Sequence, residues 1–200
     1  RGKHKAMVLE AVCFTGELCL ATRRVEPAEQ AYARALELAL QRGSDGELPR
    51  IWARLGQLAR ARGSLERAEA CLRTALSWTR SVGGSAADVR CALIRCLLEQ
   101  GRFASADAEL STLGDEEGQV PLHVLLELGM HADAGLQRRA QCRRKLEALC
   151  RRVSEDPPSR HVAQACGAVR ELARAHGWRA EAGWAKDLAA RHRHDLEQAE

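Results

Sequence analysis

The sequence has 200 residues; 46% of them are hydrophobic but only 4% are aromatic, and the formal net charge is +4. β-Sandwiches and barrels need more β-branched and aromatic residues, and disordered chains contain fewer apolar ones, so the composition argues against both. Frequent Ala, Leu, Arg and Glu favour an all-α fold, and the small charge surplus does not favour a general nucleic-acid binder.

The cellular setting is inferred from charge, chain start and cysteine spacing. No window of 18 residues is apolar and uncharged, so we expect no membrane span. The chain starts with Arg-Gly-Lys rather than Met, which we interpret as a piece of a longer protein. Its eight cysteines are scattered without a C-x-x-C pair, so we expect core residues in a reducing, cytoplasmic compartment.

Residues 9–44 are expected to form a first pair of helices. Ala28, Tyr32 and Ala35 follow each other at spacings of four and three, which places them on one face of the second helix. Gly16 lies twelve residues before Ala28, and Pro27 marks the start of the second helix. The longer segment 41–48 then leads to the next pair.

Residues 49–82 carry the clearest pattern, W-x2-L-G-x2-A followed by A-x3-L-x2-A. The large and small residues of each half share one helix face, which predicts two antiparallel helices with apolar faces. The small residues Gly56 and Ala68 allow the two backbones to approach closely. Gly63 is expected to end the first helix and Ser64 to cap the second.

Three further pairs are predicted at 87–114, 121–153 and 159–192. They are placed by Ala106, Cys142 and Ala182, which repeat the position of Ala68. The intervals between these small residues, counted from Ala28, are 40, 38, 36 and 40 residues. Pro49, Pro121 and the pair Pro157-Pro158 fall at expected helix starts or between pairs.

This pattern resembles the tetratricopeptide repeat (TPR) family, in a long-repeat form of about 36–40 residues per unit. The matching positions in residues 49–82 are Trp52, Leu55, Gly56, Gly63, Ala68, Leu72 and Ala75. The resemblance implies that residues 1–200 form one all-α solenoid, a right-handed superhelix of about five hairpins.

The resemblance also implies a concave groove lined by the first helix of each hairpin. The groove residues expected to bind a partner are Glu17, Arg50, Arg54, Gln57, Arg60, Asp88 and Arg95. Arginine forks bind carboxylates and phosphates, so an acidic or phosphorylated peptide is one interpretation. The alternative is that these arginines are solvated or pair with Glu17, Asp88 or Glu99 of neighbouring hairpins.

Charge is divided unevenly in the second half of the chain. Residues 103–137 contain seven acids and no Lys or Arg, whereas residues 138–152 contain seven bases and one acid. The two blocks could complement each other within the fold, form a charged docking surface or contact nucleic acid. The candidate docking residues are Arg138, Arg139, Arg143 and Arg144.

Motifs of catalysis, cofactor binding and metal binding are missing from the sequence, so no catalytic, cofactor or metal residue is predicted. His192 and His194 are the closest histidine pair. At a spacing of two on a helix they point to different sides, which does not favour a shared metal ion.

The predicted function is therefore a protein-interaction scaffold that binds a protein or peptide, as the regulatory or adaptor part of a larger protein. One alternative keeps the fold but makes it a sensor arm that controls a fused kinase, nucleotide-binding switch or protease. Another is an RNA-binding helical repeat. Self-association through the terminal hairpins, where a solenoid leaves apolar flanks, is also kept open.

Overall fold

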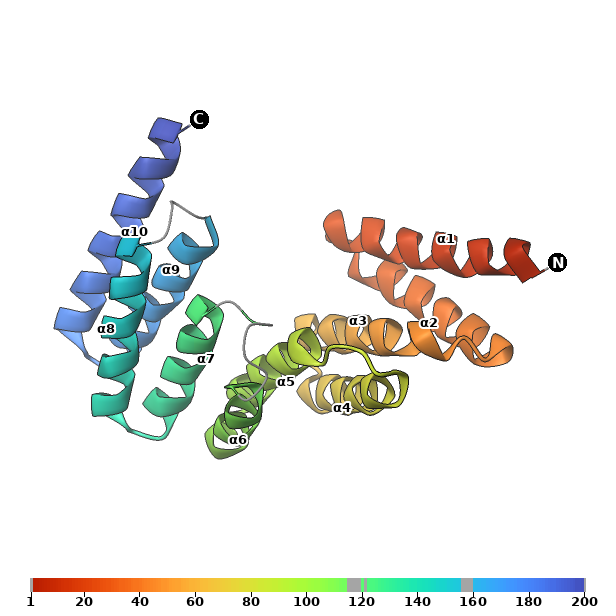
Figure 1. Cartoon of the computed structure of the whole chain (residues 1–200), viewed down its shortest axis with the longest axis horizontal. Helices are drawn as coiled ribbons and strands as arrows, with labels where there is room; N and C mark the ends of the chain where they lie inside the picture. The colour runs from red at the N-terminus through yellow and green to blue at the C-terminus, as the bar shows by residue number, and fades with distance from the viewer. Residues whose placement is uncertain (1, 115–119, 121, 156–159, 200) are drawn as a thin grey trace. The chain divides into compact units, whose positions relative to one another are not determined.

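A computed structural model describes residues 2–114, 120, 122–155 and 160–199, with side chains placed for residues 7–113, 120, 124–148, 166–187, 189 and 190. This part of the chain is built from α-helices and one short 3-10 helix, without strands, as Figure 1 shows. The all-α prediction is confirmed. No helix among the described residues is long and apolar enough to cross a membrane.

The chain divides into two compact units, residues 1–100 and 101–200. The first contains α1 (Gly2–Ala21), α2 (Val25–Arg42), η1 (Asp45–Glu47), α3 (Leu48–Ala61), α4 (Leu65–Val82) and α5 (Ala87–Glu99). The second contains α6 (Phe103–Gly114), α7 (Leu122–Gly135), α8 (Arg139–Glu155), α9 (Arg160–Ala175) and α10 (Arg179–Ala199).

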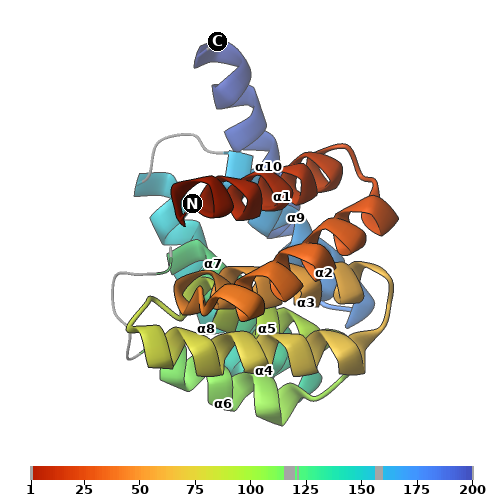
Figure 2. The ribbon, with the colours of Figure 1, turned by 90° about the vertical axis from the view of Figure 1, so that its right-hand side faces the viewer.

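Helices of the first unit pack in the order of the chain. Each of α1 to α4 contacts the helix that follows it, and α3 also contacts α5. Figure 2 shows α1 at the edge of this stack, with α2 beneath it. The core extends from Leu9 on α1 through Tyr32 on α2 to Leu58 on α3, and all three side chains are buried. Serial packing of this kind is that of a helical-repeat solenoid.

Small residues bring the two helices of a hairpin together, as the sequence predicts. A Cβ atom on Gly56 would lie 2.7 Å from Cγ of Leu72 and 3.2 Å from the carbonyl oxygen of Ala68. One hairpin earlier, a Cβ atom on Gly16 would lie 2.7 Å from the ring of Tyr32. Glycine at these two positions is therefore required by the packing of α3 on α4 and of α1 on α2.

A left-handed residue recurs in the turns between helices at the period of the repeat. A residue with a left-handed backbone occurs at Arg23, Gly63, Gly101, Gln137 and Gly177, at intervals of 40, 38, 36 and 40 residues. After Gly63, the amide of Ser64 donates to the carbonyl oxygen of Ala59 at 2.9 Å, which is the hydrogen bond of a Schellman motif. The period predicted from the small residues thus appears again in the backbone.

The cap predicted at Ser64 is confirmed in position only: Ser64 occupies the N-cap position of α4, but its side chain makes no capping hydrogen bond. The carbonyl oxygen of Ser64 accepts the first hydrogen bond of the helix, from the amide of Ala68 at 2.9 Å.

In the second unit α7 contacts α6, α8 and α9, while α10 packs on α9 and touches α8. Its core joins Met130 of α7, Cys142 of α8, Val169 of α9 and Ala185 of α10, which are all buried. Burial of these apolar side chains stabilises the second unit, as burial of the other core stabilises the first.

The described cysteines are free thiols, and all except the half-buried Cys91 are buried. Pro27 is the third residue of α2 and Pro49 the second of α3, at the helix starts where the sequence places them. Pro121, Pro157 and Pro158 lie outside the described residues. The proposed repeat boundaries and the superhelical path stay predictions.

Candidate functional site

A hollow in the first unit gathers most of the predicted groove residues. It has a volume of about 620 Å³ and runs between α3 and α5, and we call it the arginine hollow. Predicted residues that line it are Arg50, Arg54, Gln57, Asp88 and Arg95. They reach the same space because positions three, four and seven apart share one side of a helix, here on α3 and on α5.

Apolar and small side chains complete the lining of the arginine hollow. Ala53 of α3, Val89 and Ala92 of α5, and Val82 at the end of α4 contribute apolar surface. Gly46, Gly84 and Ser85 come from the connections that precede α3 and α5. The sequence does not indicate the residues from α4 and from the connections, because their place depends on how the helices cross.

The arginines of the hollow are held by neighbours. Arg54 Nε lies 3.0 Å from Oε1 of Glu17 on α1, and its Nη1 lies 2.9 Å from Oε1 of Gln57. Arg50 pairs with Glu47 of η1 at 3.0 Å, and its side chain is 50% exposed. Arg54 is therefore fixed in position, whereas Arg50 keeps much of its surface in solvent.

Arg60, which the sequence places in the groove, lies outside the lining of the arginine hollow. It pairs with Glu99 of α5. The alternative in which groove arginines pair with acids of neighbouring hairpins therefore holds for Arg60 with Glu99 and for Arg54 with Glu17. The role of the predicted residues in binding remains a prediction.

A second hollow adjoins the first, because Gly46 and Arg50 line both. Its volume is about 550 Å³, and its other lining residues are Glu10, Phe14, Glu17 and Glu47. The predicted residue Glu17 lies here. Cys13 of the same helix is buried, and burial raises the pKa of its thiol above the ordinary value. The positive charge of Arg50 acts in the opposite direction and lowers this pKa. Arginines therefore dominate one hollow and carboxylates the other.

The basic residues predicted as a docking surface in the second unit are mostly paired. Arg138 contacts Asp107 of α6 at 2.7 Å, and Arg143 contacts Glu147 at 3.1 Å. Arg139 lies 3.6 Å from Glu181 and stacks over the ring of Trp178 at 5.7 Å. Arg144 is exposed on α8.

A further pair, between Lys145 and the buried Asp133 at 2.7 Å, joins α8 to α7. Together with the contact between Arg138 and Asp107, it shows that the acidic and basic blocks complement each other within the second unit. The charges that would attract nucleic acid are thereby partly neutralised.

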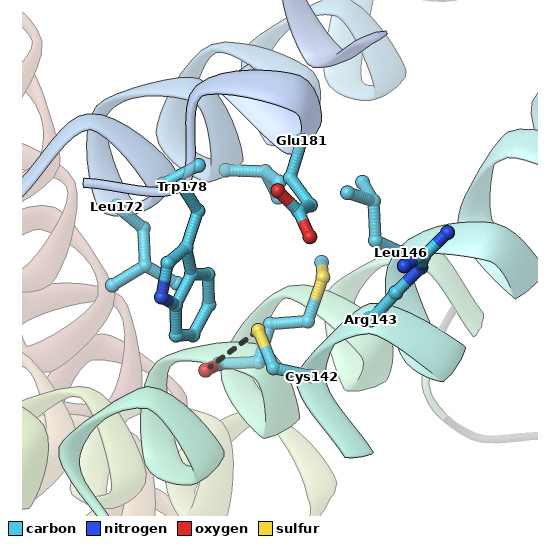
Figure 3. A pocket seen from close by; sticks show the side chains of 9 residues that line it. Cys142, Arg143, Leu146, Leu172, Trp178 and Glu181 are labelled. Atoms are coloured by element: carbon cyan, nitrogen blue, oxygen red, sulfur yellow. Dashed lines mark hydrogen bonds between the residues drawn. The ribbon is translucent and has the colours of Figure 1, made fainter. Parts of the chain in front are cut away.

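A small cavity lies in the core of the second unit, as Figure 3 shows. Cys142, Leu146, Leu172 and Trp178 surround it, and the buried Glu181 carboxylate points into it. Cys142 Sγ donates to the carbonyl oxygen of Met130 at 3.6 Å, and burial raises the pKa of its thiol to about 11. The cavity volume of about 10 Å³ is at the lower limit for holding one water molecule, so the cavity is too small for an organic ligand.

Metal ligands are not grouped in the part of the chain that the structure describes: no three His, Cys, Asp or Glu side chains come together there. The side chains of His192 and His194 lie outside the described residues.

Comparison with known proteins adds one finding to this geometry. The family model of the tetratricopeptide repeat matches residues 49–81, which cover nearly all of α3 and of α4. A search of curated proteins gave no match. The matched segment contains the Gly56–Leu72 contact and supplies Arg50, Arg54 and Gln57 to the arginine hollow. The tetratricopeptide-repeat resemblance predicted from the sequence is therefore confirmed for residues 49–81.

Proposed function

We propose that the protein is an interaction module that binds an acidic segment of a partner protein in the arginine hollow. The observation that carries this proposal is the hollow itself: about 620 Å³, open to solvent, with three arginines and one acid, Asp88, among its lining residues. A tetratricopeptide repeat supports protein binding in general, and the excess of arginine supports an acidic or phosphorylated segment in particular.

The lining suggests how such a segment would be held. Arg54 is already oriented by Glu17 and Gln57, so little side-chain entropy is lost when it binds a carboxylate. Arg50 is half exposed, so a carboxylate of the bound segment can reach its guanidinium beside Glu47. Val82 and Val89 offer apolar surface beside them, which suits an apolar residue next to the acid.

The test uses a library of random peptides selected on the whole chain. We expect the selected peptides to be enriched in Asp and Glu next to an apolar residue, and their affinity to fall as salt is raised. The variant with Arg50→Glu, Arg54→Glu and Arg95→Glu should bind them at least about 100-fold more weakly, because attraction becomes repulsion at three positions.

A matched control reverses three arginines of the same unit that do not line the hollow: Arg34→Glu, Arg73→Glu and Arg80→Glu. This control variant changes the net charge by the same amount as the test variant. Its affinity for the selected peptides should stay within about threefold of that of the original chain. Equal weakening in both variants would mean that only net charge attracts the peptides. Peptides that bind both variants as well as the original chain would place the site elsewhere.

The proposal includes a binding rather than a catalytic function, a regulatory or adaptor role within a larger protein, and a reducing, cytoplasmic location. Free thiols at the described cysteines support the location. The sensor-arm alternative uses the same binding site. It differs only in the fused domain, a kinase, nucleotide-binding switch or protease, that the repeats would control. The RNA-binding alternative is less well supported, because Arg138, Arg139 and Arg143 pair with carboxylates of their own unit.

A further inference from the structure

The two hollows of the first unit meet at Gly46 and Arg50, which line both of them. We call the second one the carboxylate hollow, because Glu10, Glu17 and Glu47 line it. Three arginines and one acid line the arginine hollow, whereas three acids and one arginine line the carboxylate hollow. The two hollows therefore adjoin each other with opposite charge, and the sign changes at Arg50.

Two ion pairs connect the linings of the two hollows. Arg54 of the arginine hollow pairs with Glu17 of the carboxylate hollow at 3.0 Å, and Arg50 pairs with Glu47 at 3.0 Å. A carboxylate of a bound segment that contacts Arg50 or Arg54 shares the guanidinium group with these glutamates. The negative charge of the carboxylate hollow is then less well compensated, and a cation on the same segment can compensate it.

We propose that the segment bound in the arginine hollow also carries a lysine or arginine, and that this basic residue lies in the carboxylate hollow. Glu10 is exposed and makes no ion pair with another described residue, so its carboxylate is open to a cation of the partner. Phe14, which is 70% exposed, lines the same hollow and offers its ring to the aliphatic stem or the charged group of that residue. The inference rests on the proposed binding of an acidic segment and adds a second, opposite charge to that segment.

The peptides selected on the whole chain test this inference. We expect Lys or Arg to be enriched in them at a fixed distance from the Asp and Glu positions. Replacing that basic residue by methionine, which keeps a long side chain without the charge, should weaken binding at least about tenfold. The variant Glu10→Gln with Glu47→Gln should bind the basic and the methionine peptide within about threefold of each other, because two carboxylates that attract the cation are gone. Glu17 is left unchanged in this variant because it orients Arg54.

The control is Glu26→Gln with Glu37→Gln on α2, which makes the same charge change at two exposed glutamates that line neither hollow. This variant should keep the preference for the basic peptide. Acidic peptides without an enriched basic residue, a methionine peptide that binds equally well, or a preference that survives Glu10→Gln with Glu47→Gln would overturn the inference and leave the proposed function standing. Equal loss of the preference in the control would overturn it too. Selection of no acidic peptides would overturn the proposed function and this inference together.

Discussion

At the scale of single residues, Gly56 shows how one missing side chain determines helix packing. Leu72, which is fully buried, fills the space where a Cβ atom of residue 56 would lie. Tyr32 does the same above Gly16. The sequence predicts that Gly56 allows close approach, but not which side chain uses the space. That depends on the crossing of α3 and α4.

We expect Gly56→Ala to lower the free energy of unfolding by about 1–3 kcal/mol, since Leu72 and the Ala68 backbone must move to make room. The control is Gly183→Ala on α10, where an added Cβ meets nothing within 4 Å. This change should raise stability by about 0.5–1 kcal/mol through helix propensity. Urea unfolding followed by circular dichroism measures both. A Gly56→Ala protein as stable as the original would contradict this close packing of α3 on α4.

At the scale of elements, five turns between successive helices contain a left-handed residue at the repeat period, but the residue type differs. Three have Gly at the left-handed position, but Arg23 and Gln137 adopt it with φ of 57°. The turn is nevertheless the same: the amide of Arg24 donates to the carbonyl oxygen of Cys19 at 2.8 Å, and that of Arg138 to Asp133 at 2.7 Å. Because these two turns lack glycine, the sequence pattern identifies them less clearly than Gly63.

Arg23→Gly should therefore raise the free energy of unfolding by about 0.5–1 kcal/mol, since glycine adopts a left-handed backbone without strain. The neighbouring Arg24→Gly is the control: Arg24 has φ of −92°, so glycine relieves no strain there and should bring no gain. Thermal unfolding of the two variants, compared at equal protein concentration, measures the difference. An equal effect of both would show that the left-handed turn at Arg23 is not strained.

At the scale of the whole molecule, the described residues form two units with separate cores. One core extends from Leu9 to Cys71, and the other joins residues of α7, α8, α9 and α10. Both hollows belong to the first unit, and the paired acidic and basic blocks belong to the second. The sequence predicts one continuous array and does not reveal this division, because every hairpin repeats the same pattern.

Residues 1–100, produced alone, should fold into a helical protein that unfolds cooperatively, because they form a compact unit with a hydrophobic core of their own. They should bind the selected acidic peptides within about threefold of the whole chain, since both hollows are complete in this segment. Circular dichroism and fluorescence polarisation check the two expectations. An unfolded fragment, or a folded one that no longer binds, would show that the second unit is needed for the site.

The amino-acid sequence by itself determined the all-α class, the repeat and its period. These follow from local rules: Ala28, Ala68 and Ala182 recur where two helices must approach, and Gly63 ends a helix where the chain must turn. The tertiary structure decided which charges meet. Three ion pairs join residues that are separated in the sequence and lie on different helices: Arg54 with Glu17, Arg60 with Glu99, and Lys145 with Asp133. Whether such side chains meet depends on how the helices pack, which no local sequence pattern encodes. The arginine hollow between α3 and α5 is decided in the same way.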